Sequence, residues 1–481
     1  MSDGNLKIVT NSSGYGVYTS TIGMSSGKWY AEAVATAMTY THFGLIKSDV
    51  NYSSSTIVGN ATDTAAYRSN DGVFRLGNSN KFTGATFAAN DVIGLGFDAD
   101  AGSCAVYKNG SLQGTATGFS SGTWFFAGSD NDGTTSATHV WNFGQRPFKY
   151  TNAGTNRPAA TYLSLCTTNL ADPTIADGST AFDVALYTGN GSTQSITGLN
   201  HSPDFVWIKC RSAAKSHSWF DSVRGATKLL KSDVTQSEST QSGGVTSFDS
   251  NGFSMGSRGG NNENNATFVA WAWDAGTSTV TNTDGSITSN VRVNQSTGFS
   301  IATYTGNGTV NSTVGHGLNA APSLVIIKNR SNAYGWAVLH TSAGTTGTTL
   351  DGSAEYYMLQ LDSDAARNNF TNDNIWNPTN STFKINGSGT ANWVNANGDY
   401  YVAYSWAPVE GFSAFGSYEG NGSNDGPFVY TGFRPRWVII KNVDNYGTGY
   451  DWFIFDTARD TFNVADNPLN ANLNAAEADY D

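Results

Sequence analysis

The sequence predicts an all-β protein made of several β-sandwich domains in tandem. Short runs rich in β-branched and aromatic residues recur along the 481 residues, and Gly, Asn, Asp or Ser separates them. Only 13% of the residues are charged, whereas 54 are Gly, a composition that favours tight turns over helices. We expect less than about 10% helix, with the best helical stretch at Asn470–Asp479 and a shorter turn near Ala226–Lys231.

The charge and the cysteine content exclude several classes of function. A net charge of −12 without any basic cluster argues against binding to nucleic acid or anionic lipid. No apolar stretch approaches the roughly 18 residues of a membrane helix, and the polar N-terminus is unlike a signal peptide. Cys104, Cys166 and Cys210 lie far apart, so we expect small hydrophobic residues rather than a disulfide or metal framework. The protein is therefore expected to be made in a cytosol without membrane insertion.

Residues 1–150 are expected to form the first sandwich. The Asn-Gly pair in Lys108–Ser111 is a strong signal for a hairpin turn. Six segments have the length and composition of strands: Lys28–Val34, Phe43–Ile46, Val73–Leu76, Val92–Phe97, Cys104–Tyr107 and Gly122–Ala127. Regular short strands with such turns are typical of a sandwich.

Four successive motifs in this region resemble those of a SPRY domain. They are Gly27-Lys-Trp-Tyr30, Phe43-Gly-Leu45, Asn90-Asp-Val-Ile-Gly-Leu-Gly-Phe-Asp98 and Val106-Tyr-Lys-Asn-Gly110, and Trp141-Asn-Phe-Gly144 resembles the closing strand. The resemblance covers residues 20–145. It implies a concanavalin-like bent sandwich that binds partners through loops at one end and is not an enzyme fold.

After a connector at 151–181, the chain repeats. Tyr-x-Gly-Asn-Gly begins at Tyr187, Tyr304 and Tyr418, and a Pro-x-x-Val-x-Ile-Lys strand begins at Pro203, Pro322 and Pro435. A Trp-led strand follows at Trp219, Trp336 and Trp452, and a closing strand spans Phe268–Trp273 and Tyr401–Trp406. The period is that of a whole small domain. We predict modules at 182–297, 298–410 and 411–481, in which the three motif tyrosines are equivalent, as are Trp207, Ile326 and Val438 or their neighbours.

The third module lacks the closing strand. A sandwich without its closing strands exposes an unpaired edge and an apolar face, here near Trp437–Lys441 and Trp452–Phe455. We therefore expect either that the chain continues beyond Asp481 or that a partner fills the gap.

The repeated unit resembles a module of tail-fibre-like and other virion proteins of marine phages, cyanophages especially. The resemblance rests on Tyr187-Thr-Gly-Asn-Gly191, Pro203-Asp-Phe-Val-Trp-Ile-Lys209 and Phe220-Asp-Ser-Val-Arg-Gly-Ala-Thr-Lys228, and covers residues 182–481. It implies a virion context, in which the module often stands beside a SPRY domain.

The sequence offers no catalytic, cofactor-binding or metal-binding constellation. No two of the six histidines share ligand spacing on one expected element, and His42 is expected to be a surface or half-buried residue. Asp98–Gly102 and Asp130–Gly133 invite a calcium interpretation, but hairpin turns explain them better. Asp221 and Arg224 match Asp456 and Arg459, whereas the second repeat has His340, which favours a structural ion pair.

The expected function is that of a bacteriophage virion structural protein, a tail fibre, spike or capsid knob with a role in host attachment. Its expected partners are other virion proteins and a glycan or protein of the host surface. We expect a homotrimer, made in the infected bacterial cytoplasm and kept in the virion. A tailspike-like polysaccharide depolymerase is the alternative, although none of the 38 acidic residues stands out as a catalytic pair. A non-viral lectin or adhesin fits less well, because it should carry an export signal.

Overall fold

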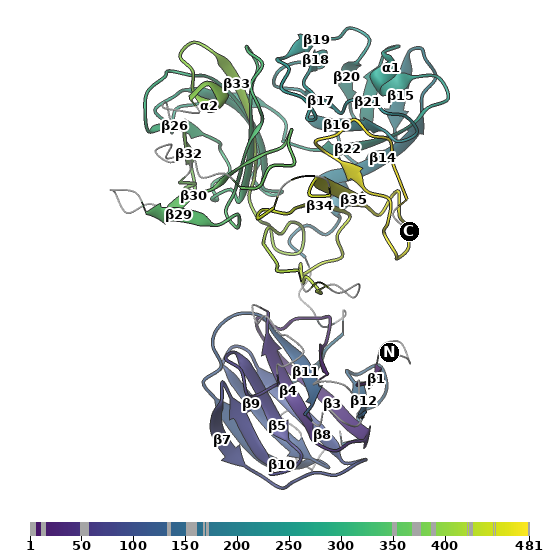
Figure 1. Cartoon of the computed structure of the whole chain (residues 1–481), viewed down its shortest axis with the longest axis vertical. Helices are drawn as coiled ribbons and strands as arrows, with labels where there is room; N and C mark the ends of the chain where they lie inside the picture. Colours follow the sequence, from purple (N-terminus) through teal and green to yellow (C-terminus); the bar gives the residue numbers. More distant parts are fainter. Residues whose placement is uncertain are drawn as a thin grey trace. The chain divides into compact units, whose positions relative to one another are not determined.

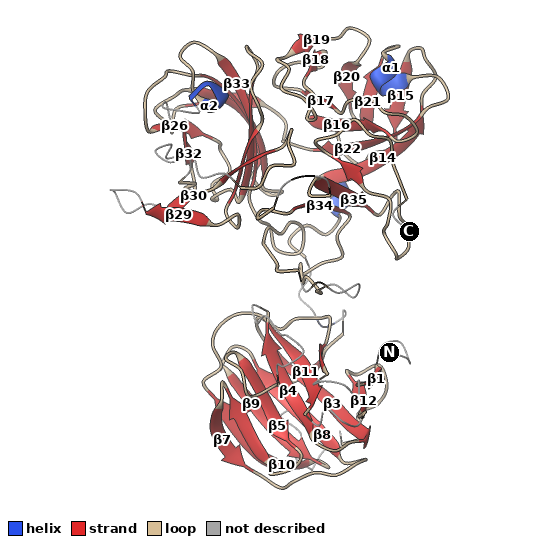
Figure 2. Cartoon of the chain, viewed as in Figure 1, coloured by secondary structure: helices blue, strands red, loops and turns tan. Residues whose placement is uncertain are grey.

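A computed structural model shows an almost wholly β protein, with 43% strand and 3% helix, as predicted (Figure 2). It describes residues 6–10, 16–48, 57–131, 136–150, 161–166, 169, 173–348, 354–367, 377–385, 391–420, 422, 427–445, 447 and 449–479. The chain forms two compact units. Unit 1 comprises Met1–Asp172 with Tyr418–Gly432, and unit 2 comprises Pro173–Ser417 with Phe433–Asp481.

Unit 1 contains two large sheets that face each other (Figure 1). Their strands pair antiparallel, except that β13 runs parallel to β3. The first has the order β1-β12-β3-β8-β9-β10, with β13 beside β3, and the second has the order β2-β11-β4-β5-β6-β7. The strands of the first sheet are β1 (Lys7–Val9), β12 (Thr138–Asn142), β3 (Lys28–Ala37), β8 (Val92–Asp98), β9 (Ser103–Lys108), β10 (Ser111–Thr117) and β13 (Leu163–Ser164). Those of the second are β2 (Val17–Thr19), β11 (Trp124–Asp130), β4 (Thr41–Lys47), β5 (Thr64–Arg68), β6 (Val73–Leu76) and β7 (Ser79–Thr83).

The six strands expected in this unit are all present, because their apolar residues pack into one core between the sheets. Trp29, Phe43 and Trp141 lie in that core, and the rings of Phe43 and Trp141 meet edge to face at 5.5 Å. The turn between β9 and β10 places Asn109 and Gly110 at φ of 48° and 80°. Positive φ at both residues is the geometry that an Asn-Gly hairpin requires.

Unit 2 holds three related copies of one strand arrangement. In the first copy the main sheet has the order β14-β22-β16-β17, and a second sheet has the order β15-β21-β20. These strands are β14 (Phe182–Thr188), β22 (Thr267–Trp273), β16 (Phe205–Cys210), β17 (Ser218–Asp221), β15 (Gln194–Thr197), β21 (Gly252–Met255) and β20 (Val245–Asp249). The small elements are η2 (Gly178–Thr180), β18 (Lys228–Leu229), β19 (Ser239–Thr240) and α1 (Gly259–Asn262).

The main sheet of the second copy repeats this strand order, with two added strands at one edge and one at the other. Its main sheet has the order β23-β24-β25-β33-β27-β28-β31. These strands are β23 (Thr279–Asn282), β24 (Ser289–Asn294), β25 (Phe299–Thr305), β33 (Tyr400–Trp406), β27 (Leu324–Asn329), β28 (Ala337–His340) and β31 (Met358–Gln360). The remaining elements are β26 (Ser312–Gly315), β32 (Thr382–Ile385), β29 (Thr345–Thr348), β30 (Ala354–Tyr356) and α2 (Ala391–Val394).

The third copy has three described strands, β34 (Trp437–Lys441), β35 (Trp452–Asp456) and β36 (Leu469–Asn470), in that order. Two predictions about helices are wrong. Ala226–Lys231 contains β18, and residues 470–479 begin in β36 and contain no helix. In the first segment Leu230 bridges to Trp219 and lies in the core, and the second segment begins with Asn470, which pairs with Phe453 of β35. Both pairings require extended backbone.

The central strands of the main sheets in the first two copies are buried on both faces. One face of each complete sheet packs into the core of its own copy, where Val206 and Phe220 lie in the first copy and Val325 and Leu339 in the second. The opposite faces meet in one core shared by all three copies. That core includes Phe205, Trp207, Trp219, Trp271, Ile326, Trp336, Tyr404, Trp452, Ile454 and Leu469.

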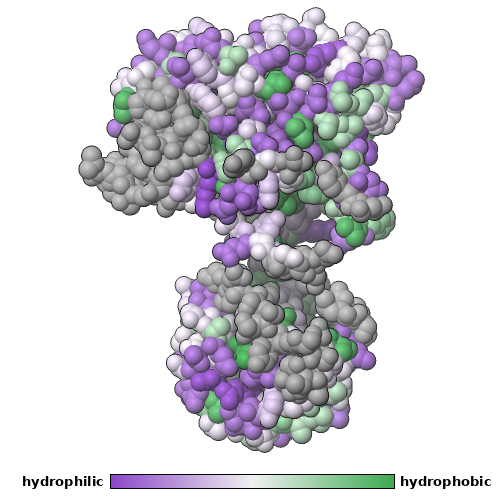
Figure 3. Space-filling view, viewed as in Figure 1, coloured by the Kyte–Doolittle hydropathy of each residue, from purple (hydrophilic) through white to green (hydrophobic). Residues whose placement is uncertain are grey.

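On the face drawn in Figure 3, hydrophilic and near-neutral residues prevail among those described, and strongly hydrophobic ones appear singly. No helix in the described part of the chain is long and apolar enough to span a membrane.

Candidate functional site

The Tyr-x-Gly-Asn-Gly motif is built alike in the first two copies. The ring of Tyr187 stacks on Phe268 at 5.1 Å, and the ring of Tyr304 stacks on Tyr401 at the same distance. Each motif tyrosine donates its hydroxyl to a backbone oxygen 2.7 Å away, of Asn261 in one copy and of Val394 in the other. The two tyrosines are therefore equivalent, as the repeat predicts.

A buried asparagine holds each of these turns. Asn262 accepts a hydrogen bond from the backbone N–H of Asn190 at 2.8 Å and donates to the side-chain oxygen of Asn190 at 3.1 Å. Asn395 makes the same two contacts with Asn307, at 2.9 and 3.2 Å. Sequence reasoning missed both asparagines, because their distance along the chain from the motif differs between the copies.

The third motif does not form the same structure. Tyr418 lies outside any strand and is 49% exposed, so the prediction that it is equivalent to Tyr187 and Tyr304 is wrong. In the complete copies the stacking partner of the tyrosine comes from the closing strand, β22 or β33. The third copy has no such strand among its described residues, and this is why its motif tyrosine has no equivalent stacking partner.

The Pro-x-x-Val-x-Ile-Lys strands correspond closely in all three copies. Trp207 pairs with Trp219, Ile326 with Val338, and Ile439 with Ile454. Ile439 rather than its neighbour Val438 is therefore the residue equivalent to Trp207, within the one-residue margin of the prediction.

The same register corrects the alignment of the Trp-led strand. The first residues of β16, β27 and β34 pair with Asp221, His340 and Asp456. Trp336 and Trp452 lie four residues before His340 and Asp456. In the first copy the residue four before Asp221 is His217. Trp219 instead matches Val338 and Ile454. The tryptophan was misaligned because its large apolar side chain suits either position.

The three copies are joined head to tail by equivalent contacts. His217 Nε2 lies 2.9 Å from the backbone oxygen of Asn470 in the third copy. Trp336 donates to the backbone oxygen of Lys231 in the first copy, at 2.9 Å. Trp452 donates to that of Gln360 in the second, at 2.7 Å. Each copy thus contacts one neighbour in the same direction, and the copies close into a ring with approximate threefold symmetry.

The lysine that ends each strand makes a second set of such contacts. Lys209 donates to the backbone oxygen of Asn474 at 3.3 Å, Lys328 to that of Thr235 at 3.1 Å, and Lys441 to that of Asp364 at 3.0 Å. Burial lowers the pKa of Lys209 and of Lys328 to about 8 and also lowers that of Lys441. The lysines are thus structural donors that join neighbouring copies.

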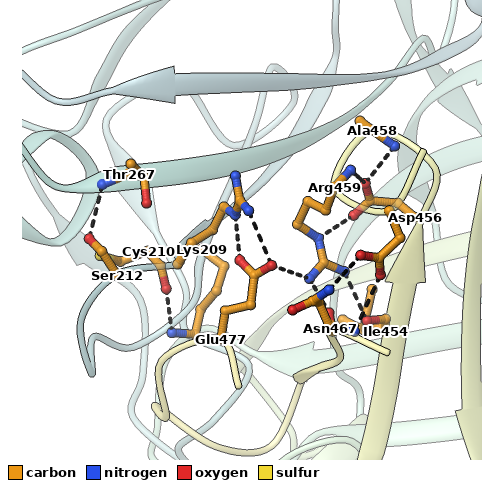
Figure 4. Close-up of polar contacts among 12 residues, drawn as sticks. Lys209, Cys210, Ser212, Thr267, Ile454, Asp456, Ala458, Arg459, Asn467 and Glu477 are labelled. Atoms are coloured by element: carbon orange, nitrogen blue, oxygen red, sulfur yellow. Dashed lines mark hydrogen bonds and ion pairs between the residues drawn. The ribbon is translucent and has the colours of Figure 1, made fainter. Parts of the chain in front are cut away.

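A buried ionic cluster lies where the third copy meets the first, and Figure 4 shows most of its members (Figure 4). Arg459 donates to Asp456 at 2.6 Å, and the side chains of both residues are fully buried. Glu477 lies 3.6 Å from Arg459 and makes a two-pronged contact with Arg211, whose second bond is 3.1 Å long. Trp271 of the first copy also donates to Asp456, at 3.0 Å.

The equivalent cluster lies where the first copy meets the second. Asp221 pairs with Arg224, both with fully buried side chains, and Tyr404 of the second copy donates to Asp221 at 2.7 Å. Glu238 contacts Arg224 at 3.1 Å and Arg330 of the second copy at 2.8 Å. Burial raises the pKa of Glu238, but its bonds and charges with Arg330 and Arg224 outweigh burial and hold the pKa below its ordinary value.

The third joint has a different composition at matching positions. Arg367 lies at the position of Glu238. Ala343 lies at the position of Arg224, and Val443 lies at the position of Arg330. Arg367 donates to the backbone oxygen of Ala343 at 2.9 Å and pairs with Asp444 at 2.7 Å. Its backbone N–H bonds to Val443, as that of Glu477 bonds to Arg211. Because all three positions differ at this joint, no glutamate is buried here without an arginine partner.

These clusters are suited to joining the copies and not to catalysis. Their carboxylates already accept bonds from arginine, tyrosine or tryptophan, and an arginine guanidinium does not release its proton at physiological pH. The Asp–Arg pairs noted in the sequence are therefore buried ion pairs.

The histidines and calcium candidates lie elsewhere. His42 is 1% exposed and its Nδ1 lies 3.0 Å from the backbone oxygen of Val58, so the prediction of a surface or half-buried position is wrong. It lies in β4, a strand with neighbours on both sides.

The first calcium candidate is a hairpin turn, as expected. Asp98 accepts a hydrogen bond from the N–H of Ala101 in the turn between β8 and β9. Residues 132 and 133 of the second candidate lie outside the described residues, and the described residues contain no group of three or more His, Cys, Asp or Glu able to hold a metal.

Residues 177–481, which contain the ring, match the model of a family described as "Domain of unknown function (DUF7483)". The chain belongs to the DUF7483 family. No curated protein matches it.

The solved structures that are similar to the chain include SPRY domains. The SPRY domain of human HERC1 is 18% identical over 30% of this chain and 92% of that chain, with a TM-score of 0.27. A second human SPRY domain is 20% identical over 30% and 94%, with a TM-score of 0.25. The PSpry domain of TRIM65 is 10% identical over 26% and 68%, with a TM-score of 0.22.

The third copy differs from the other two in the number of described neighbours of its Pro-x-x-Val-x-Ile-Lys strand. β16 pairs on both sides, with β22 and β17, and β27 pairs on both sides, with β33 and β28. Among the described residues β34 pairs only with β35. All residues of β16 and β27 are buried, whereas every residue of β34 is partly exposed. This edge, with the partly exposed side chains of Val438, Ile440 and Phe455, is the candidate binding site and is called the open edge.

Proposed function

We propose that the chain is a bacteriophage virion structural protein, part of a tail fibre, spike or capsid knob, with a role in attachment to the host surface. The motifs of residues 182–481 support this proposal through their resemblance to virion modules of marine phages. The observation that supports it best is the ring of three related copies. The ring uses its charged and aromatic groups to join the copies and leaves loops outside it for contacts with partners.

The partners that we propose are other virion proteins, namely an adaptor, tail or capsid component, and a glycan or protein of the host surface. The protein is then made in the infected bacterial cytoplasm and incorporated into the virion. A homotrimer is part of the proposal, since linking several weak binding sites strengthens attachment. The resemblance of the first sandwich to SPRY domains supports a binding role for its loops.

Mass spectrometry of purified particles tests the virion role. We expect the chain in particles that remain intact through a density gradient, at a copy number that fits a fibre, spike or knob. Its absence from such particles, with the protein present in the infected-cell lysate, would contradict the proposal.

A second experiment tests the binding role. Full-length protein is incubated with host-surface polysaccharide, and both retention on host cells and release of reducing ends are measured. We expect retention without reducing ends. Release of reducing ends would favour a polysaccharide depolymerase instead.

The proposed trimer is tested by sedimentation of the full chain. A stable monomer whose third copy resists proteases would contradict it.

A further inference from the structure

We propose that the joint between the third and first copies is a pH-sensitive latch, which His217 holds closed while its ring is neutral and releases when the ring gains a proton. In mild acid the ring of three copies would then open at this joint and stay closed at the other two. The inference concerns the ring alone and does not depend on the virion role.

Each joint is made by a segment of eight residues that lies across the neighbouring copy and is called a strap here. The straps are residues 231–238, 360–367 and 470–477. The carbonyl oxygen of the first strap residue contacts Trp336, Trp452 or His217 of the neighbour. That of the fifth accepts from the buried lysine of the neighbour. The backbone N–H of the eighth donates to a carbonyl oxygen of the neighbour, from Glu238 to Arg330 at 3.1 Å, from Arg367 to Val443 at 2.8 Å and from Glu477 to Arg211 at 2.8 Å.

Hydrogen bonds at both ring nitrogens fix the protonation state of His217. Nδ1 accepts the indole N–H of Trp207 at 2.7 Å, and Nε2 lies 2.9 Å from the carbonyl oxygen of Asn470. A carbonyl oxygen only accepts, so Nε2 carries the single proton of the neutral ring. A second proton would go to Nδ1 and face the indole N–H, which cannot accept it. His217 can therefore become charged only when its bond to Trp207 breaks.

The charged groups around His217 do not offer its ring a partner for a positive charge. Lys209, on β16 of the same copy, is itself a cation. Asp233 accepts from the backbone N–H of His217 at 3.0 Å, so its carboxylate is engaged by the main chain. Glu477, on the strap, is paired with Arg211. The closed joint thus favours the neutral ring.

Burial is the largest effect on His217, whose side chain is 0% exposed, and the charge of Lys209 acts in the same direction. Together they outweigh the carbonyl groups of Asn470 and Leu473 and hold the pKa of His217 well below its ordinary value. Opening the joint admits water, in which the pKa of a histidine is about 6.5. Below that pH the open state binds more protons than the closed state. The closed joint should therefore weaken as the pH falls, by up to about tenfold per pH unit.

The other two straps are bound by groups that do not titrate in this range. Trp336 and Trp452 lie at the place of His217, and their indole N–H groups donate at any physiological pH. His340 lies in the second copy, but its Nδ1 accepts from Ser342 of the same copy. Free carboxyl groups gain protons mainly below about pH 4.5. The window from pH 6.5 to 5 therefore separates the latch from carboxylates.

The test is hydrogen exchange of the full chain from pH 7.5 to 5.0, corrected for the intrinsic pH dependence of exchange. The three reporters are the equivalent amides of Glu477, Glu238 and Arg367, which each bond across one joint. We expect the protection of the Glu477 amide to fall by up to about tenfold per pH unit below pH 6.5, while the other two keep theirs. Loss of protection at all three amides together would show unfolding of the whole ring and would overturn the proposal. So would equal protection of all three down to pH 5.

The matched variants are His217→Gln and His340→Gln. A glutamine amide can accept from Trp207 and donate to Asn470, but it does not titrate. His217→Gln should therefore abolish the pH dependence at Glu477, whatever its effect on protection at pH 7.5. His340→Gln should leave that dependence unchanged. A His217→Gln protein whose Glu477 amide keeps the pH dependence of the wild type would assign the acid sensitivity to another group.

Discussion

Trp336 donates its indole N–H to the backbone carbonyl oxygen of Lys231, 2.9 Å away, across a sequence separation of 105 residues. The bond joins the second copy to the first. Trp452 bonds to Gln360 in the same way, and His217 contacts Asn470. One relationship is therefore used three times with different side chains, and each instance depends on both copies being folded. This makes the joints between copies testable one at a time.

Replacing Trp336 by phenylalanine should lower the free energy of unfolding by about 1–3 kcal/mol, because the carbonyl of Lys231 loses its buried donor. The measurement is urea unfolding of the full chain followed by far-UV circular dichroism. Trp452→Phe should have a similar effect, since its bond to Gln360 is equivalent. Tyr400→Phe, at an exposed position, should stay within about 0.5 kcal/mol of the wild type. Equal stability of Trp336→Phe and Tyr400→Phe would contradict this role of the indole.

Glu238→Gln should destabilise the protein by about 3 kcal/mol at pH 7, because it removes the carboxylate that pairs with both Arg224 and Arg330 and leaves Asp221 as the charged partner of Arg224. The folded-state pKa of Glu238 is lowered, so its contribution is present above the ordinary pKa and is lost as the pH falls through the folded value. The difference between variant and wild type should therefore shrink in acid. The control is Glu263→Gln, which removes a half-exposed pair with Lys215 and should cost less than about 1 kcal/mol. A Glu238→Gln effect that is constant with pH would argue against this charge role.

Asn262→Ala and Asn395→Ala should each cost about 2–3 kcal/mol, because each asparagine satisfies several polar groups of a motif turn. Hydrogen exchange should quicken at the turn held by the altered residue, Asn190 or Asn307, and not at the other turn. Asn397→Ala, two residues from Asn395 and exposed, serves as the control. If both turns loosened in either variant, local clamping would not be the role of these asparagines.

The buried lysines predict an unusual dependence of stability on alkaline pH. The pKa of Lys328 is about 8 in the folded protein, below the ordinary value of 10.5, because burial disfavours its charge. Between these two values the unfolded chain binds more protons than the folded chain, so stability rises with pH in this window. The stability of the wild type relative to Lys328→Met should increase from pH 7.5 to pH 9.5, at up to about 1.4 kcal/mol per pH unit.

Lys209→Met should behave in the same way, because burial lowers the pKa of Lys209 to about 8 as well. Comparing variant with wild type at each pH cancels the contribution of the tyrosines. A difference that does not change between pH 7.5 and pH 9.5 would contradict the prediction.

Local sequence determined the strands and turns of this protein. The runs that contain Phe43, Val92 and Trp124 became strands because β-branched and aromatic residues suit a covered, pleated surface. Asn109 and Gly110 formed a hairpin turn because both tolerate positive φ. The repeated motifs also predicted the equivalence of Tyr187 and Tyr304, since a shared pattern of side chains produces a shared strand pairing.

The tertiary structure decided which side chains meet, because those partners are far apart in sequence and no local pattern specifies them. His42 is buried because its strand lies inside a sheet, and segment 226–231 is extended because Leu230 reaches the shared core. The position of His217, rather than Trp219, at the joint became visible only from the strand register. Glu477 meets Arg211 across 266 residues only because the three copies close into a ring, whose cores must be covered and whose buried charges must be paired.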